Sequence, residues 1–338
     1  MTDTAAGTVD YSIVIPVYYN EGELRTTFEA IEREVILENP ELSGEVVFVD
    51  DGSGDGSLAE LLELHAEHPE IVRVIKLTRN FGQPAARLAG LSFARGRCVM
   101  SMSADGQDPA ELLHQMLHAH IDEGWQVVIC ARKGRDESLY RSWTSRIFYG
   151  SMRSLRFHNM PAGGFDFVLL GRKALDVILK NREANPFFQG QVLWAGFPPK
   201  VLEYRRRKRK VGVSRWSFGK KLKLMLDAVL SYSYAPVRWM SVSGVAMALL
   251  GFLTAAVLVV RRLAWGTEVE GWTALIVVVL FTSGMQMLMI GILGEYQWRT
   301  LAQARDRDPF VVDEIYDATL DAAPPGTASR RTDTTPRA

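Results

Sequence analysis

The sequence predicts an α/β domain followed by a pair of membrane-spanning helices. Over the first two hundred residues, short apolar β-rich runs alternate with stretches of helical periodicity, and near the C-terminus two long runs contain no charged residue. The chain has 338 residues, of which 47% are hydrophobic and 23% charged, a composition typical of a folded protein rather than a disordered one. The length suits one large domain or two ordinary ones.

Five runs rich in β-forming residues predict the strands of this domain, at residues 11–17, 45–49, 72–77, 97–102 and 126–131. Helical periodicity follows four of them, at 23–37, 57–65, 85–94 and 109–121. The strands are almost continuously apolar, which indicates a mainly parallel sheet covered by helices on both faces. Ligands bind such sheets beyond the carboxyl ends of the strands, so the residues that follow each strand are the first candidates for a site.

The residues after the predicted strands are unusually polar, at 16–21, 50–56, 78–82, 103–109 and 132–135. They gather carboxylates with arginines nearby, which suits a nucleotide diphosphate held through Mg²⁺ or Mn²⁺, because these cations prefer oxygen ligands. Each stretch alone is also a common turn or helix cap, and Asp55, Ser57 and Asp108 are interpreted as caps. The informative feature is that such polar stretches follow all five predicted strands in turn. No Gly-Lys-Ser/Thr follows a glycine loop, which excludes the phosphate-loop pattern.

Charge is balanced over the chain but concentrated in one segment. Lys plus Arg number 39 and Asp plus Glu number 39, so a protein that binds nucleic acid through bulk charge is excluded. All charged residues of 205–223 are nevertheless basic, and most of the six basic residues at 205–210 are interpreted as an anchor to anionic lipids. The two cysteines, Cys98 and Cys130, lie in apolar runs and are interpreted as core residues in a reducing compartment.

Two uncharged runs, residues 240–260 and 271–294, predict a transmembrane hairpin. Each is long enough as a helix to cover roughly 30 Å, the thickness of a bilayer core. Basic residues flank the pair on both outer sides, so the positive-inside rule places both flanks in the cytoplasm, although Arg261 and Arg262 in the short connecting loop oppose this. No signal peptide precedes residue 10, which agrees with a cytoplasmic N-terminal domain on a multi-pass protein of the inner cell membrane.

The remaining segments complete the predicted domain organisation. Residues 1–9 are expected to be flexible, 10–210 to form the α/β domain, and 211–238 to form amphipathic helices at the membrane surface. Residues 297–338 are expected to be a cytoplasmic tail, disordered from Asp317 onwards because that stretch is rich in Ala, Pro, Thr and Asp.

The order of four motifs, at residues 12–21, 49–53, 79–82 and 105–109, resembles the family 2 glycosyltransferases. More closely, the chain resembles the polyisoprenyl-phosphate glycosyltransferases, a group that contains dolichol-phosphate mannose synthase and bacterial undecaprenyl-phosphate glucosyl- and aminoarabinosyltransferases. Residues 164–172 resemble that group's Asp-Phe-x-Leu-Leu-x-Arg motif, and residues 206–216 resemble its basic motif before the membrane. The resemblance covers roughly residues 10 to 300 and implies a Rossmann-like GT-A fold for the α/β domain.

The resemblance implies donor-site roles. The residues implied to bind the nucleotide sugar are Pro16, Tyr18, Glu21, Asp50, Asp51, Arg79 and Asp105. Within this set Asp50 would read the base or ribose, with Asp51 supporting it, and Asp105 with Gln107 would hold Mg²⁺ or Mn²⁺. Ser103 stands where the usual pattern has an acid. The Tyr-Tyr-Asn-Glu stretch is one residue longer than usual, which leaves open whether Tyr18 or Tyr19 stacks on the base.

The resemblance also implies an acceptor site. Its phosphate-binding residues would be Arg132, Arg141, Arg209, Ser214 and Arg215, and bidentate contact explains why arginine suits a phosphate. Asp166 is the candidate base, which gives Asp105, Asp166, Arg132 and Arg141 as the catalytic set. The alternative for Asp166 is a turn carboxylate that caps the preceding glycines.

The implied activity is inverting transfer of a hexose-type sugar from a nucleotide sugar to undecaprenyl phosphate, giving a lipid-linked sugar for the cell envelope. UDP is favoured as the nucleotide. The alternatives are a GDP-mannose-dependent polyprenyl-phosphate mannosyltransferase, a processive polysaccharide synthase and a non-catalytic nucleotide-sugar binder. The chain lacks the Gln-x-x-Arg-Trp signature and the additional spans of a processive synthase. The partners expected are the donor, the lipid acceptor and the membrane, with no nucleic acid, and the sequence leaves a homo-oligomer open.

Overall fold

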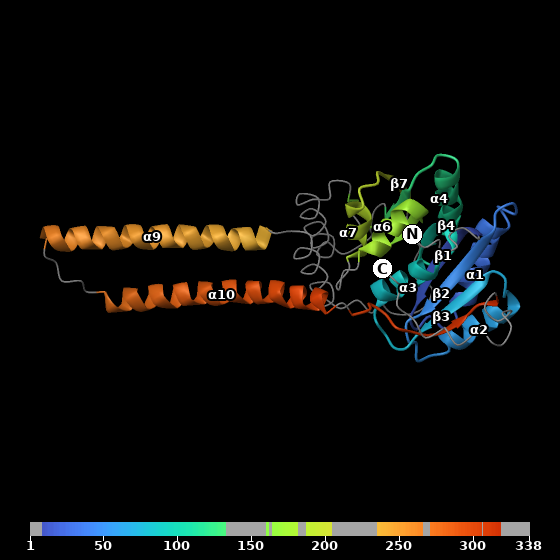
Figure 1. Cartoon of the computed structure of the whole chain (residues 1–338), viewed down its shortest axis with the longest axis horizontal. Coiled ribbons are helices and arrows are strands. Elements are labelled where there is room, and N and C mark those ends of the chain that lie inside the picture. Colours follow the sequence, from blue (N-terminus) through green and yellow to red (C-terminus); the bar gives the residue numbers. More distant parts are fainter. Residues whose placement is uncertain are drawn as a thin grey trace. The chain divides into compact units, whose positions relative to one another are not determined.

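The computed structural model describes residues 9–132, 160–161, 164–181, 187–204, 235–265, 271–305 and 307–318. The chain divides into two compact units (Figure 1). The first comprises Met1–Leu224 with Asp308–Ala338, and the second comprises Met225–Arg307. The first unit is thus formed by the stretches of sequence that precede and follow the second unit.

The first unit is built on an eight-stranded sheet in the order β7-β5-β6-β4-β1-β2-β3-β8. Its strands are β1 (Val9–Val17), β2 (Gly44–Asp50), β3 (Val72–Leu77), β4 (Gly96–Ser101), β5 (Val127–Arg132), β6 (Phe167–Gly171), β7 (Pro199–Tyr204) and β8 (Val312–Tyr316). Strands β4, β1, β2 and β3 form a continuous parallel block, and β5 pairs with β7 in parallel. The predicted parallel sheet is confirmed in this block, whereas β6 and β8 run antiparallel to their neighbours.

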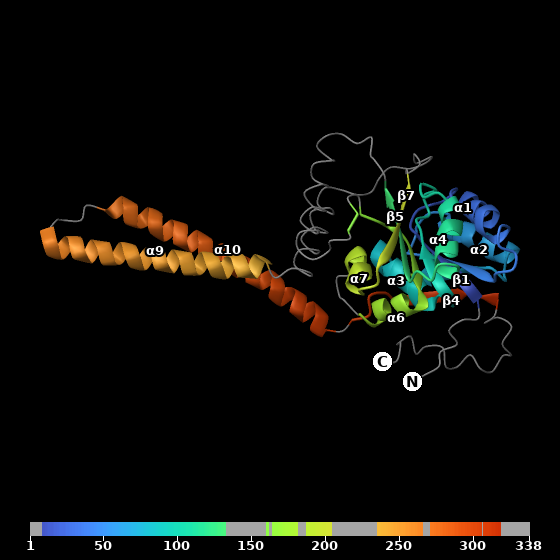
Figure 2. The same cartoon turned by 90° about the horizontal axis from the view of Figure 1, so that it is seen from above.

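Helices cover both faces of the sheet, as Figure 2 shows from above. On one face lie α1 (Leu24–Ile31), its π-helical continuation η1 (Glu32–Ile36), α2 (Ser57–Glu67) and α4 (Glu111–Ile121), which share an apolar core with the strands. On the other lie α3 (Gln83–Phe93), α6 (Arg172–Lys180) and α7 (Phe188–Trp194). Helix α3 approaches closely because Gly90 faces β1: a Cβ there would lie 2.3 Å from Cγ1 of Val14.

The two cysteines confirm the interpretation as core residues. Cys98 and Cys130 are both buried and neither is in a disulfide. Burial raises the pKa of the Cys98 thiol to about 12, with smaller support from Asp10, and burial also raises the pKa of the Cys130 thiol. Both thiols are therefore chemically inert at neutral pH.

The edge strand β8 was not predicted, and it changes the description of the C-terminal tail. Its residues Ile315 and Tyr316 pair with Ile75 and Val74 of β3, although a membrane-length helix precedes β8 in the chain. The prediction that disorder begins at Asp317 was wrong for that residue, because its side chain is buried in the first unit. The reason is electrostatic: Asp317 completes a buried network of charges.

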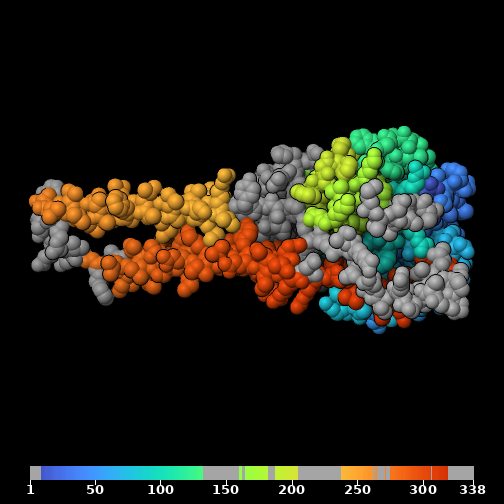
Figure 3. All heavy atoms as spheres, viewed as in Figure 1, coloured from blue at the N-terminus to red at the C-terminus, as the bar shows by residue number. Residues whose placement is uncertain are grey.

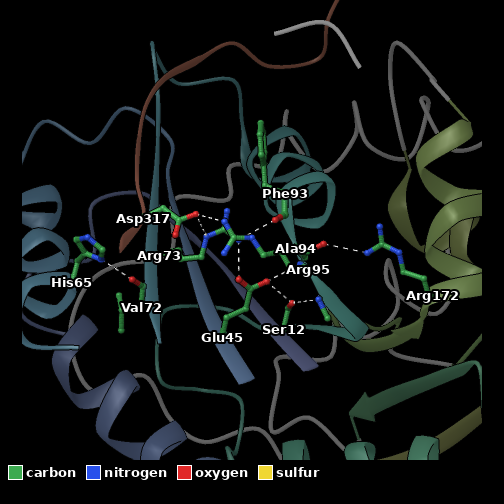
Figure 4. Close-up of polar contacts among 11 residues, drawn as sticks. Ser12, Glu45, His65, Val72, Arg73, Phe93, Ala94, Arg95, Arg172 and Asp317 are labelled. Atoms are coloured by element: carbon green, nitrogen blue, oxygen red, sulfur yellow. Dashed lines mark hydrogen bonds and ion pairs between the residues drawn. The ribbon is translucent and has the colours of Figure 1, made fainter. Parts of the chain in front are cut away.

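Figure 4 shows this network of charges. Arg73 of β3 donates to Glu45 of β2 at 2.8 Å and to Asp317 at 3.0 Å. Arg95 also donates to Asp317, and the hydroxyl of Ser12 donates to Glu45 at 2.7 Å. Two cations and two anions therefore balance within the sheet, and one of the anions comes from the chain after the second unit.

The second unit contains α9 (Ala235–Trp265) and α10 (Trp272–Ala304), which contact one another (Figure 3). Stretches of 25 and 30 residues, Val237–Arg261 and Leu275–Ala304, are long and apolar enough to cross a membrane, and none of their most apolar windows is buried. Helices that are apolar on all sides without being buried suit a lipid environment. The predicted runs 240–260 and 271–294 overlap these stretches, and both helices extend beyond them. Of the expected juxtamembrane segment, residues 211–234 lie outside the described residues.

Candidate active site

The strand register brings the predicted site residues to one edge of the sheet. Val17 of β1 is level with Asp50 of β2, while Ser101 of β4 is level with Val14 of β1 and with Val168 of β6. The carboxyl ends of the parallel strands therefore meet the start of the antiparallel β6. As a result Asp166, which directly precedes β6, shares an edge with the polar loops that follow β1, β2 and β4.

Two adjacent carboxylates end β2. Asp50 is buried and accepts 3.3 Å hydrogen bonds from the backbone N–H of Ser53, and burial raises the pKa of Asp50 against the opposing effect of these bonds. Asp51 is also buried, and its two oxygens accept from the N–H groups of Phe81 and Gly82 at 2.7 and 2.9 Å. Burial raises the pKa of Asp51 as well, with those N–H groups acting against it. Asp51 thus anchors the loop after β3.

Close packing of two loops positions Arg79. Gly52 has φ +68°, and a Cβ there would lie 2.7 Å from the carbonyl carbon of Arg79, so the loop after β2 passes directly against the loop after β3. The exposed Arg79 guanidinium lies 4.0 Å from the centroid of the Phe81 ring and donates to the Asn80 carbonyl. Only glycine fits this crossing without strain.

The loop after β1 contains a non-glycine residue with positive φ, Tyr19. This residue has φ 57°, a region that non-glycine residues rarely adopt, at a cost on the order of 1–3 kcal/mol. The backbone N–H of Tyr19 donates to the Ser53 hydroxyl at 3.1 Å, and the Tyr18 and Tyr19 rings meet edge to face at 4.7 Å. Both rings are exposed, so both stay candidates for stacking.

Glu21 makes a hydrogen bond at the start of α2, whereas Pro16 is buried in the sheet. The Glu21 carboxylate accepts from the N–H of Gly56 at 3.0 Å, at the start of α2, where an acidic side chain is favoured by the helix dipole. Pro16 is buried within β1 opposite Val49. One oxygen of Glu21 is therefore already used by the protein, and Pro16 shapes the base of the loop.

A chain of hydrogen bonds follows β4. The Ser103 hydroxyl donates to Asp105 at 2.5 Å and to Asp108 at 3.1 Å, and the Gln107 N–H donates to Asp105 at 3.3 Å. Asp108, interpreted as a helix cap, is instead buried and accepts from the Tyr204 hydroxyl at 2.8 Å. The serine in place of an acid thus supports Asp105 directly, and Asp108 ties this loop to the end of β7.

Asp105 offers oxygen atoms to a divalent cation, but not a complete protein cage. Among the described residues no three His, Cys, Asp or Glu side chains gather as a metal site. Mg²⁺ is usually held by one or two carboxylates together with substrate phosphates and waters, and a single partly exposed Asp105 flanked by a hydroxyl and an amide fits that mode.

The candidate base, Asp166, is half-buried at the start of β6. Its Oδ1 accepts a 3.0 Å hydrogen bond from Nε2 of Gln189 in α7. Gly163, which the alternative turn interpretation involves, lies outside the described residues. The contact with α7 gives Asp166 a partner that sequence reasoning did not identify.

Arg141, Arg209, Ser214 and Arg215 lie outside the described residues. Arg132 is the last residue of β5, which brings its backbone to the same edge as Asp166.

Sequence reasoning missed Arg87. It belongs to the buried face of α3 together with Ala86, Gly90 and Leu91, and its guanidinium lies 4.6 Å from the Phe188 ring centroid in α7. A single charged residue at the apolar positions of a helix was the available signal, because charged side chains are rarely fully buried.

Known proteins are similar to this chain over most of its length. The family model described as glycosyl transferase family 2 matches residues 12–179. An uncharacterized glycosyltransferase of Bacillus subtilis is 33% identical over 309 residues, covering 91% of this chain and 94% of its own. The SfII prophage-derived bactoprenol glucosyl transferase of Shigella flexneri is 31% identical and covers 89% and 96%. The undecaprenyl-phosphate 4-deoxy-4-formamido-L-arabinose transferase of Pseudomonas aeruginosa is 36% identical and covers 93% and 92%.

These relatives extend over nearly the whole chain, helix pair included. The chain therefore belongs to glycosyltransferase family 2 and, within it, to the polyisoprenyl-phosphate glycosyltransferase group, as an enzyme with a GT-A catalytic domain.

Proposed function

We propose that the enzyme transfers a hexose-type sugar, with inversion, from a nucleotide sugar to undecaprenyl phosphate. The observation that carries this proposal is the meeting of Asp50, Asp105 and Asp166 at one sheet edge in a chain with two membrane-length helices. Two relatives, a bactoprenol glucosyl transferase and an undecaprenyl-phosphate sugar transferase, support a lipid-phosphate acceptor by their names.

The loops after β1, β2 and β3 would bind the nucleotide. Asp50 lies at the end of β2, where a buried carboxylate can accept hydrogen bonds from the ribose or the base. The exposed rings of Tyr18 and Tyr19 would stack on the base, and Arg79 beside them would face the phosphates. UDP is favoured over GDP because the chain has the membrane hairpin of the bacterial subgroup.

Asp105, with Gln107 nearby, would hold Mg²⁺ or Mn²⁺ between the protein and the diphosphate. When bound, the cation neutralises the charge that develops on the departing nucleoside diphosphate. Ser103 keeps the Asp105 carboxylate oriented through the 2.5 Å hydrogen bond. This donor set is weaker than one with two acids, so we expect modest metal affinity in the absence of nucleotide.

The lipid phosphate would displace the diphosphate directly. A bond forms between a phosphate oxygen and the anomeric carbon, the bond from that carbon to the diphosphate oxygen breaks, and the nucleoside diphosphate leaves. The acceptor phosphate is mostly ionised near neutral pH because its second pKa is about 6. Asp166 would take the remaining proton from a monoanionic acceptor, while Arg132, Arg141, Arg209, Ser214 and Arg215 would position its phosphate.

The proposed location is the cell membrane, with the catalytic unit on the cytoplasmic side. Strand β8 follows α10 in the chain and pairs with β3, which precedes α9, so both flanks of the helix pair belong to one folded unit. A folded unit lies on one side of a membrane, which supports a hairpin that crosses twice. The basic residues of 205–223 would attract anionic lipid headgroups on that side.

The test is transfer by the purified full-length protein. It is incubated with undecaprenyl phosphate, Mn²⁺ and a panel of radiolabelled UDP-sugars and GDP-mannose, and lipid-linked product is extracted into organic solvent. Single-sugar product with inverted anomeric configuration is expected. Polymeric product would favour a processive synthase, product only from GDP-mannose would favour the mannosyltransferase, and nucleotide binding without product would favour a binder.

A further inference from the structure

Arg87 is a buried cation that makes no hydrogen bond through its Nε in the described part of the chain. Its exposed fraction is 4%. Burial lowers the pKa of Arg87, while the carboxylates of Asp166 and Asp108 act in the opposite direction. A guanidinium stays protonated in proteins, so the charge persists inside the fold.

Arg73 is a buried arginine of the same unit whose guanidinium is hydrogen-bonded within the protein, and it serves as a comparison for Arg87. Its side chain is 6% exposed, and it donates to Glu45, to Asp317 and to the Phe93 carbonyl at 2.8 to 3.0 Å. Burying a charge without such partners is costly, because hydration is lost and not replaced. Among the described residues, Asp166 and Asp108 offset this cost electrostatically, but no residue accepts a hydrogen bond from the Arg87 Nε.

The surroundings of Arg87 place it within the candidate active site. Asp166 and Asp108 are its charged neighbours, and each already accepts a hydrogen bond, from Gln189 and Tyr204 respectively. Asp108 is linked through Ser103 to Asp105, the predicted metal ligand. Arg87 therefore interacts electrostatically with the candidate base and with the carboxylate that Ser103 links to the predicted metal ligand.

The contact of Arg87 with α7 supplies no hydrogen-bond acceptor oxygen. The Arg87 guanidinium lies over the ring of Phe188, with 4.6 Å between its Cζ and the ring centroid. The N–H groups of a guanidinium form a fork that matches two oxygens of a phosphate. The Nε of Arg87 has no hydrogen-bond partner among the described residues, so a phosphate oxygen could supply one.

We propose that Arg87 binds a phosphate group of one of the two substrates. This inference rests on the proposed function, in which both the nucleotide-sugar donor and the lipid acceptor bring a phosphate to this edge of the sheet. A bound phosphate would supply the hydrogen-bond acceptor that the Arg87 Nε lacks among the described residues, and Arg87 would then be a substrate-binding residue that the motifs do not include.

The test uses purified full-length protein in detergent with Arg87→Met, Arg87→Lys and the matched control Arg97→Met. The side chain of Arg97 is 74% exposed at the start of β4, the opposite end from the site. Affinities for UDP and for uridine are measured by calorimetry, and KM is measured for undecaprenyl phosphate. Melting temperatures without ligand show whether each variant is folded.

Arg87→Met is expected to weaken phosphate binding by about 10- to 100-fold, as for a lost charge-assisted hydrogen bond, with unchanged or higher thermal stability. Weaker UDP binding with unchanged uridine binding would identify the donor diphosphate as the ligand. A higher KM for the lipid with unchanged UDP affinity would identify the acceptor phosphate. Arg87→Lys should lose less, and Arg97→Met should match the wild type.

The proposal is overturned if Arg87→Met keeps wild-type affinity for UDP and a wild-type KM for the lipid. It is also overturned if Arg87→Met fails to fold while Arg87→Lys keeps both values, since Arg87 would then be structural. A wild-type protein that binds UDP but transfers no sugar would contradict the proposed function instead. The UDP affinity of the Arg87 variants would then still show whether Arg87 binds the phosphates of the donor.

Discussion

Removing the Asp317 carboxylate should strongly destabilise the catalytic unit. Asp317 is 2% exposed and accepts from both Arg73 and Arg95. In Asp317→Ala, the Arg95 guanidinium would lose this carboxylate partner, and the buried Arg73 guanidinium would keep only that of Glu45. Breaking a buried charge network by removing one partner costs about 3–5 kcal/mol, and the partial exposure of Arg95 favours the lower end of that range.

This loss is large relative to the stability of a typical domain, about 5–15 kcal/mol. For a unit of this size each kcal/mol corresponds to roughly 2–4 °C, so the melting temperature should fall by roughly 6–20 °C. The assay is thermal unfolding of the full-length protein in detergent, followed by tryptophan fluorescence. The result also reports whether β8 is an integral strand, because Asp317 directly follows it.

The matched control is Asp313→Ala on the same segment. Asp313 forms a 2.6 Å ion pair with Lys76, but its side chain is 43% exposed. Exposed pairs contribute about 0–1 kcal/mol, so this variant should melt within a few degrees of the wild type. Equal melting temperatures for Asp317→Ala and Asp313→Ala would refute the reasoning, because the buried network would then contribute no more than a surface pair.

Three further residues and the topology give predictions of their own. Asp105→Ala should lower turnover by about 10²- to 10³-fold while its melting temperature stays near that of the wild type; full turnover would exclude the metal role. Asp50→Asn should bind UDP more weakly than the wild type but have a higher melting temperature at pH 7. Burial raises the pKa of Asp50, so the charged form lowers native-state stability as pH rises, and the stability difference should vanish below about pH 4. A lower melting temperature of the variant at pH 7 would contradict this. Asp166→Asn should be nearly inactive at pH 6 and partly active at pH 8, as the acceptor phosphate ionises by itself; equal loss at both pH values would argue against proton removal. A cysteine replacing Thr267 should react with a reagent added outside the cell, and one replacing Ser329 should not; the opposite labelling would reverse the proposed topology.

Local patterns in the sequence predicted the central elements of the catalytic unit. The run at residues 72–77 became β3 with the same limits, and helix α2 begins at Ser57 as predicted. Such patterns succeed because burial of a strand or of one helix face repeats along a few adjacent residues. The strand-end motifs succeeded for a related reason, since parallel strands bring their carboxyl ends to one edge whatever the loop lengths.

The contacts of Asp105 could not be predicted from its motif alone. The motif marks Asp105, whereas only the tertiary structure shows the Ser103 hydroxyl bridging Asp105 and Asp108, and Tyr204 completing the contact from β7. Likewise the sequence marks Asp166 through its own motif, but its partner Gln189 comes from a helix that carries no recognised motif.

Partners that are distant along the chain were decided by the tertiary structure. Strand β8 is short and partly exposed, and its partner β3 lies on the other side of both apolar helices in the sequence, so nothing local marks it as part of the sheet. Arg87 is marked in the sequence only as a charged residue among apolar helix positions, and its significance depends on burial by α7 and on two carboxylates from other elements. The sequence alone thus predicted β1 to β5, the helices that follow β1 to β4 and the two long apolar runs, because hydrophobic periodicity is a local property. The pairing of charges, and the buried Arg87 Nε without a hydrogen-bond partner in the described fold, became visible only when the folded chain had removed water from them.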